Sequence, residues 1–289
     1  MGRTVRARWE ARGRTILSGD DPVPKVMGIV NVTPDSFSDG GRIAGLDEAL
    51  IRARRLVAEG ADLLDLGGES SRPGSEPVSV DEELHRVIPV VEALSEGLVV
   101  PISIDTFKAE VARRALDAGA AIINDISALA GDPDMGRVAA ESGAGVVLMH
   151  MQGVPKTMQV NPRYADVVRD IYDFLARRVE WAESIGIPRD RIAIDPGIGF
   201  GKTIEHNLEI LRNLRRFDTL GCAVVIGTSR KGFLGTITGR GLPERATASV
   251  VSSLAACAEG VRVVRVHDVA PMVDAIKVWG ALRGWKETS

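Results

Sequence analysis

Polar side chains stand at the ends of several short apolar runs in this sequence. Each run has the composition of a strand buried on both faces, and each polar residue falls where the strand would pass into a loop. In a parallel α/β fold the carboxyl ends of the strands meet on one side, so these side chains would share a site. The positions are Asn31, Glu69 to Arg72, Asp105, Asn124, His150, Asp195, Lys231, Arg265 and His267.

The residue types in this set suit two kinds of ligand group. Two acids, an amide and a lysine can bind the edge of a planar heterocycle that carries amidine-like donors. These residues are Asp105, Asn124, Asp195 and Lys231. An amide, an arginine and a histidine can hold an anion, and the last two alternate on one strand and so point the same way. These residues are Asn31, Arg265 and His267.

Each position taken alone has an ordinary structural explanation. Asp105 could cap the following helix, Asn124 could complete a turn, and Asp195 before Pro-Gly is a common turn residue. Lys231 and Arg265 could be solvated charges. The site hypothesis therefore depends on the whole set recurring at successive strand ends.

The elements that would position these residues alternate along the chain. Strands are expected at 26–31, 62–66, 101–104, 120–124, 145–149, 191–194, 223–226 and 261–266. Helices are expected near 46–60, 79–95, up to 118, after 125, from Asn161-Pro162 to about 185, and at 204–216, 245–259 and 269–282. Eight strand–helix units over about 260 residues predict an α/β fold of the (β/α)8 TIM barrel type. A doubly wound sheet is the alternative, but the Gly-rich fingerprint after its first strand is absent.

Two regions are expected. Residues 1–24 are interpreted as a short N-terminal hairpin with Gly13 at its turn, and residues 25–284 as the barrel domain. The segment Gly197 to Thr203 suggests a phosphate-binding loop, but its leading glycine is one residue too close to Gly-Lys-Thr. A tight loop against a flat ligand is the remaining interpretation.

Composition narrows the classes of partner. The chain has 289 residues, 45% of them hydrophobic, and a formal net charge of −3, which favours neither nucleic acid nor a membrane as a partner. The Arg-rich N-terminus contains Glu10 and lacks an apolar segment, so it does not favour a transit peptide, and a cytoplasmic location is expected. Cys222 and Cys257 are expected to be buried and reduced.

Several stretches resemble the dihydropteroate synthases, the pterin-binding folate-pathway enzymes that sulfonamides inhibit. The resemblance extends from about Val26 to Leu282, and the stretches 27–41 and 67–74 are the most specific. Shorter motifs follow in the same order at 103–106, 123–125, 195–202, 229–231 and 265–268.

The resemblance implies a (β/α)8 transferase that joins 6-hydroxymethyl-7,8-dihydropterin diphosphate to p-aminobenzoate and releases diphosphate with Mg²⁺ present. It also implies a homodimer. The implied pterin-binding residues are Asp105, Asn124, Ile126, Met149, Asp195, Phe200, Lys231 and Arg265. Those for diphosphate are Asn31, Arg265 and His267, with Asn31 also at the metal. Those for p-aminobenzoate are Phe37, Asp39, Ser71, Arg72, Pro73 and Lys231.

An aromatic amine is already a free nucleophile at neutral pH, so the expected mechanism needs no nucleophile–base pair. The demanding step is cleavage of the carbon–oxygen bond, and an SN1-like path would develop a cation on the pterin methylene. Acids near the ring would stabilise that charge, while Mg²⁺ and basic side chains draw off the diphosphate. The expected catalytic residues are Asp105, Asp195, Lys231, Arg265 and His267.

Two positions depart from the family pattern. Ser71 stands where many members have Thr, and Gly232 stands where a Ser is common. Both differences predict an effect on affinity for p-aminobenzoate more than on activity. Two other functions compete with the synthase hypothesis, a non-catalytic pterin-binding paralogue and a pterin-dependent methyltransferase domain. The diphosphate set and the Ser-Phe-Ser-Asp-Gly-Gly loop at 36–41 have no use in the methyltransferase.

Overall fold

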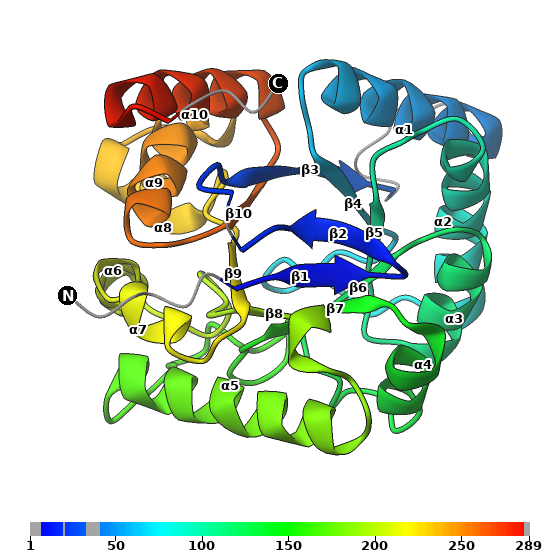
Figure 1. The fold of residues 1–289 in the computed structure, drawn as a ribbon, viewed down its shortest axis with the longest axis horizontal. Coiled ribbons are helices and arrows are strands. Elements are labelled where there is room, and N and C mark those ends of the chain that lie inside the picture. Colours follow the sequence, from blue (N-terminus) through cyan, green and yellow to red (C-terminus); the bar gives the residue numbers. More distant parts are fainter. Residues whose placement is uncertain (1–6, 20, 33–40, 286–289) are drawn as a thin grey trace.

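Eight parallel strands close into a barrel in the computed structural model, which describes residues 7–19, 21–32 and 41–285. The strand order around the barrel is β10-β3-β4-β5-β6-β7-β8-β9 (Figure 1). The strands are β3 (Lys25–Asn31), β4 (Leu63–Gly67), β5 (Ile102–Asp105), β6 (Ile122–Asp125), β7 (Gly145–Met149), β8 (Ile192–Asp195), β9 (Ala223–Ile226) and β10 (Val263–Val266). The predicted TIM barrel is confirmed.

Helices surround the barrel on its outside (Figure 1). They are α1 (Gly41–Ala58), α2 (Val80–Ser95), α3 (Ala109–Asp117), α4 (Met135–Ser142), α5 (Val167–Ser184), α6 (Ile204–Arg212), α7 (Arg215–Asp218), α8 (Gly232–Thr238), α9 (Ala246–Ala258) and α10 (Val269–Arg283). The predicted capping of α2 is present, because the Ser79 side chain accepts a hydrogen bond from the Glu82 amide at 3.2 Å.

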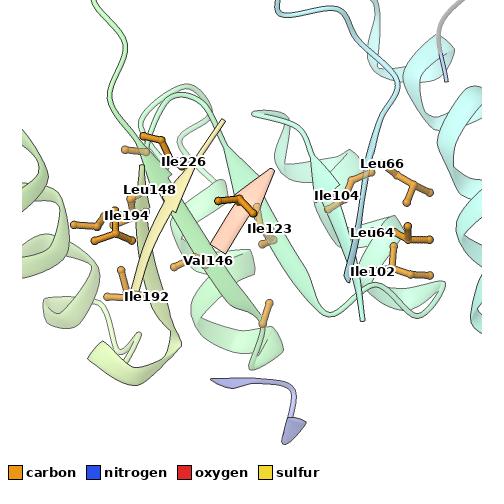
Figure 2. Close-up of a cluster of buried hydrophobic side chains, with 14 of the residues drawn as sticks. Leu64, Leu66, Ile102, Ile104, Ile123, Val146, Leu148, Ile192, Ile194 and Ile226 are labelled. Atoms are coloured by element: carbon orange, nitrogen blue, oxygen red, sulfur yellow. The ribbon is translucent and has the colours of Figure 1, made fainter. Parts of the chain in front are cut away.

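Alternation along the strands divides their side chains between two environments. On β4, Leu64 and Leu66 pack outward against the helices, whereas Leu63 belongs to a second apolar cluster inside the barrel. Figure 2 shows the outward set on β4 to β9, with labelled side chains lying between the strands and the helices. The same two-residue period turns Asp65 into the barrel.

The N-terminal hairpin closes the amino end of the barrel. Strands β1 (Trp9–Ala11) and β2 (Arg14–Leu17) pair antiparallel, with Gly13 at the turn in a left-handed conformation (φ +75°). Trp9 is fully buried with the inner apolar cluster, and its indole N–H donates to the carbonyl of Arg191 at 3.2 Å. In Figure 1 the hairpin lies across the centre of the strand ring.

Several helix boundaries differ from the sequence-based expectation. Helix α5 begins at Val167, not after Asn161, because Asp166 is the residue that caps it, accepting from the Arg169 amide at 3.0 Å. Asn161 has a left-handed conformation (φ +52°), which is incompatible with opening a helix. The predicted helix 204–216 is divided into α6 and α7 at Asn213, and α8 was not expected.

Two further expectations concern burial. Cys222 and Cys257 are both buried, free thiols, as predicted. Burial raises the pKa of each thiol to about 12, so neither is reactive as a thiolate near neutral pH. Among the described residues, no helix has both the length and the apolar character needed to span a bilayer.

Candidate functional site

A cavity of about 950 Å³ opens at the carboxyl ends of the barrel strands. It is lined by every described residue that the sequence assigned to a ligand, namely Asn31, Ser71, Arg72, Pro73, Asp105, Asn124, Ile126, Met149, Asp195, Phe200, Lys231, Arg265 and His267. Phe37 and Asp39 lie outside the described residues. The alternation of the strands explains the convergence, since the polar residue at each strand end occupies an inward position.

Arg265 forms the centre of the cavity floor. Its Nε donates to Oδ2 of Asp65 at 2.5 Å, and its Nη2 donates to Oδ2 of Asp105 at 2.7 Å. Asn124 donates from Nδ2 to the same Asp65 oxygen at 3.1 Å. Asp65 is fully buried and was not among the sequence-predicted residues. Its signal in the sequence is a single acid at an inward position of the otherwise apolar strand β4.

The buried charges of the floor shift one another's protonation. Burial raises the pKa of Asp105 to about 7, and the neighbouring Asp65 adds to the rise while Arg265 opposes it. Arg265 is itself buried, which alone would lower its pKa, but Asp65 and Asp105 together hold that pKa above its ordinary value. Arg265 therefore stays charged, whereas Asp105 is poised to change charge near neutrality.

Asp195 and Lys231 are two further charged residues that line the cavity. The Asp195 carboxylate accepts from the Gly197 amide at 2.7 Å, and burial raises its pKa. The Lys231 Nζ lies 4.1 Å from the centroid of the Phe200 ring, a distance typical of a cation–π contact. Burial and the charge of Arg265 lower the pKa of Lys231 to about 8.

The loop after β8 follows a path that only glycine allows at two points. A Cβ at Gly197 (φ +73°) would lie 2.0 Å from the carbonyl oxygen of His150, and one at Gly201 (φ +65°) would lie 2.4 Å from that of Gln152. The buried Lys202 fixes the same loop, since its Nζ donates to the carbonyl of Phe200 at 2.9 Å. This loop brings Phe200 to the cavity, as the tight-loop interpretation required.

Behind that loop, His150 does not line the cavity. Its Nδ1 lies 3.0 Å from the Nζ of Lys202, and burial with the nearby lysine charge lowers the pKa of His150 to about 3. Burial also lowers the pKa of Lys202 to about 7. His150 is thus a neutral supporting residue, and its place at a strand end misled the sequence-based grouping.

Asn31 ends β3, Arg265 lies on the neighbouring strand β10, and His267 follows β10, so these three residues line the same side of the cavity. Ser229 orients His267, because its Oγ accepts from the His267 backbone amide at 3.1 Å and lies 3.0 Å from the ring Nδ1. Burial and the charges of Arg265 and Arg230 lower the pKa of His267 to about 3, so the ring is neutral. Ser229 was not singled out as a site residue from the sequence.

The second loop lines the cavity with Ser71, Arg72 and Pro73, and largely buried ion pairs support it. Lys108 pairs with Glu69 and, at 2.5 Å, with Glu83, whose side chain is 1% exposed. Arg86 donates to the carbonyl of Gly68 at 2.8 Å. On the facing side, Gly232 begins α8 and lines the cavity, and a Cβ there would meet nothing within 4 Å.

Asn31 is the described residue that the sequence assigned to Mg²⁺. Among residues 7–19, 21–32 and 41–285 no three His, Cys, Asp or Glu side chains cluster in a way that could hold a metal ion. Mg²⁺ commonly keeps several waters and binds through one or two protein oxygens plus substrate phosphates. A single amide oxygen beside an anion pocket fits that mode, and it does not fit a protein-built metal cage.

The closed fold and its lined mouth define a (β/α)8 barrel enzyme with a small-molecule site at the carboxyl ends of its strands. Residues 27–267 match the family described as pterin binding enzyme. The dihydropteroate synthase of Haemophilus influenzae is 44% identical over 91% of this chain and 95% of its own length.

Solved structures give the same result. The Xanthomonas albilineans dihydropteroate synthase with 4-aminobenzoic acid superposes with a TM-score of 0.89 at 47% identity, covering 96% of this chain and 98% of that one. The same enzyme in complex with 7,8-dihydropteroate gives a TM-score of 0.85 at 46% identity, over 96% and 98% of the two chains. The chain therefore belongs to the pterin-binding enzyme family, within the transferases that are dihydropteroate synthases.

Replacing Gly197 by Ala tests the close approach in the loop after β8. Gly186→Ala is the matched control, because Gly186 also has a positive φ (+95°) but no atom within 4 Å of its added Cβ. Both variants should lose about 1–2 kcal/mol of unfolding free energy from the left-handed conformation. Gly197→Ala should lose a further ~1–3 kcal/mol from the clash with His150. Urea denaturation measures both, and equal losses would contradict the tight packing of this loop.

Proposed function

We propose that this chain joins 6-hydroxymethyl-7,8-dihydropterin diphosphate to p-aminobenzoate, forming 7,8-dihydropteroate and releasing diphosphate. The observation that carries the proposal is that one cavity is lined both by the acids and amide of Asp105, Asn124 and Asp195 and by the anion-binding set of Asn31, Arg265 and His267. The cavity volume falls within the usual range for small-molecule sites, and it leaves room for a heterocycle, its diphosphate and an aromatic amine. The names of the relatives agree with this reaction.

The pterin edge would bind at the floor. Asp105 uses Oδ2 for Arg265, and Asp195 uses Oδ1 for Gly197, so each acid keeps one oxygen without a partner in the described part of the chain. These two oxygens can accept from the amidine-like N–H groups of the ring. Ile126, Met149 and Phe200 line the cavity beside them and supply apolar walls for its faces.

Cleavage of the carbon–oxygen bond would be the demanding step. The bonding electron pair leaves with the diphosphate oxygen, and positive charge develops on the pterin methylene. Carboxylates of Asp105 and Asp195 near the ring stabilise that charge, while Arg265 and His267 donate hydrogen bonds to the departing diphosphate. Asn31 would hold Mg²⁺, which neutralises charge on the leaving group when bound.

The aryl amine would then supply its lone pair to the methylene carbon and lose a proton. The second loop, through Ser71, Arg72 and Pro73, would cover the amine and keep water from the cation, with Lys231 binding the carboxylate side. Phe37 and Asp39 would contribute from the first loop. Since Gly232 leaves open space at the start of α8, this contact to p-aminobenzoate would be weaker than one made by a serine.

The proposal also includes a cellular location and an oligomeric state. We expect a cytoplasmic enzyme and a homodimer formed through α9 and α10, where Val251, Val278 and Leu282 expose 62%, 62% and 82% of their surface. Sedimentation at micromolar concentration measures the oligomeric state, and a monomer there would contradict the dimer.

Amine-dependent diphosphate release tests the proposed reaction. We expect diphosphate and dihydropteroate to form together when p-aminobenzoate is added to the protein with Mg²⁺ and the dihydropterin diphosphate. Binding of the pterin without amine-dependent release would identify the non-catalytic paralogue, the second candidate function. Calorimetry with the dihydropterin diphosphate alone separates that outcome from complete loss of binding.

Asp105→Asn tests the stabilisation of the cation. The amide keeps the shape but not the negative charge, so kcat should fall on the order of 100-fold, with a smaller change in KM for the pterin. Asp117→Asn is the control, because Asp117 makes only an exposed pair with Arg113, with 67% of its side chain accessible. Steady-state kinetics at saturating pterin decide the matter, and an unchanged kcat would rule out this role.

Lys231 predicts how activity depends on pH. Its pKa is lowered to about 8, so its ammonium is present below that pH and is lost as the pH rises through it. If the charge is needed, kcat/KM for p-aminobenzoate should fall above pH 8. Arginine stays charged, so kcat/KM of Lys231→Arg should not fall above pH 8. Lys156 is exposed, so Lys156→Arg should show the same pH dependence as wild type. An unchanged limb in Lys231→Arg would assign the titration to another group.

A further inference from the structure

Asp65 is the fully buried acid beneath the cavity, and it does not line the cavity itself. In the sheet register it pairs with Ile29 on β3 and Ser103 on β5, one inward layer below Asp105. Its Oδ2 accepts from both Arg265 and Asn124, whereas its Oδ1 is buried with no partner among the described residues. A buried carboxylate with an unpaired oxygen is costly, so the contacts through Oδ2 must offset a large desolvation penalty.

The contact with Asp65 decides which donors Arg265 can offer to a ligand. A guanidinium has five N–H donors in a rigid plane. Nε and one Nη2 hydrogen form its side edge, and here that edge is divided between Asp65 and Asp105. Nη1 has no partner among the described residues. One of its hydrogens lies with the second Nη2 hydrogen on the end edge, while the other points toward the Cδ side. The end edge has the fork geometry that binds two oxygens of a phosphate group.

The same carboxylate decides how Asn124 presents its amide. Because Nδ2 donates to Asp65, the carbonyl Oδ1 is turned to the other side of the plane, and this residue lines the cavity. Without Asp65 the amide could rotate by half a turn and exchange its acceptor for a donor. One buried acid therefore fixes the hydrogen-bonding pattern of two residues that come from different strands.

We propose that Asp65 is a positioning residue that orients Arg265 toward the departing diphosphate and Asn124 toward the pterin edge. This inference rests on the proposed function, because it assigns the ligands of the two oriented groups. Asp65 touches neither ligand. Its negative charge alone would weaken anion binding nearby, so a purely electrostatic role and a positioning role predict opposite effects on diphosphate affinity.

The test measures binding of Mg²⁺-diphosphate and, separately, of 6-hydroxymethyl-7,8-dihydropterin by calorimetry. Asp65→Asn keeps the volume but removes the negative charge that holds both donors, and it replaces one carboxylate oxygen with an amide group that donates. We expect affinity for each ligand to fall about tenfold, and kcat to fall about 100-fold through misplacement of the leaving group. Stronger diphosphate binding in Asp65→Asn, or unchanged affinity for both ligands, would overturn the proposal.

Asp125→Asn is the matched control. Asp125 is also fully buried, on β6, two strands away from β4, but its partners are the amides of Ser127 and Leu129 and the Ser127 hydroxyl. This variant should lower the melting temperature and leave both ligand affinities unchanged. An equal loss of affinity in both variants would show that a general weakening of the barrel explains the effect, and would overturn the proposal.

A double-mutant cycle separates action through Arg265 from a direct effect. In the Arg265→Lys background, Asp65→Asn should change diphosphate affinity by less than about twofold, since the orientation that it controls is already lost. Full additivity would overturn the proposal. If wild type binds neither ligand, the proposed function fails as well, whereas binding by wild type with no change in Asp65→Asn removes only the role of Asp65.

A measurement on the wild-type protein covers the case in which Asp65→Asn does not fold. The Nε proton of Arg265 should give a slowly exchanging ¹⁵N-correlated signal, assigned by its loss in Arg265→Lys. Rapid exchange of that proton would show that the contact with Asp65 does not persist in solution, and would overturn the proposal.

Discussion

The charge of Arg265 lies inside a closed barrel, and the structure of the site depends on how that charge is balanced. The carboxylate of Asp65, inside the barrel, and that of Asp105, at the end of β5, both contact the guanidinium. A buried ion of either sign is unfavourable without its partners. The three side chains therefore stabilise one another only when all are present. Together they determine the positions of the charged groups at the mouth of the barrel.

The barrel interior is divided along its axis to make room for this set. The lower layers are apolar, with Trp9 and Leu17 of the hairpin packed against Met27 and Leu63. The upper layers are polar and open to the cavity. The apolar half contributes the burial that stabilises the fold, and the polar half carries unpaired acceptors and shifted pKa values. Stability and chemistry are thus assigned to opposite ends of the same strands.

Much of this arrangement could be predicted from the sequence, because it follows from a two-residue period. Once the strands were located, Asn31, Asp105, Asn124 and Asp195 had to converge, and each lines the cavity. The residues that were missed act behind the lining. Asp65 is surrounded by leucines in the sequence, and only the barrel closure brings β10 close enough for Arg265 to reach it. The start of α5 was misplaced because Asn161-Pro162 resembles a helix cap, although Asp166 makes the actual capping contact.

The N-terminal hairpin limits how a ligand can reach the cavity. Since its side chains fill the amino end, the cavity has the carboxyl-end mouth as its way to solvent within the described structure. The floor residues Asp105 and Asn124 lie on strands, whereas Ser71 to Pro73 belong to a loop farther out. A molecule bound under that loop stands between a molecule on the floor and the exit. If both positions are occupied in this way, the deeper ligand has to bind before the outer one, because both pass through the same mouth.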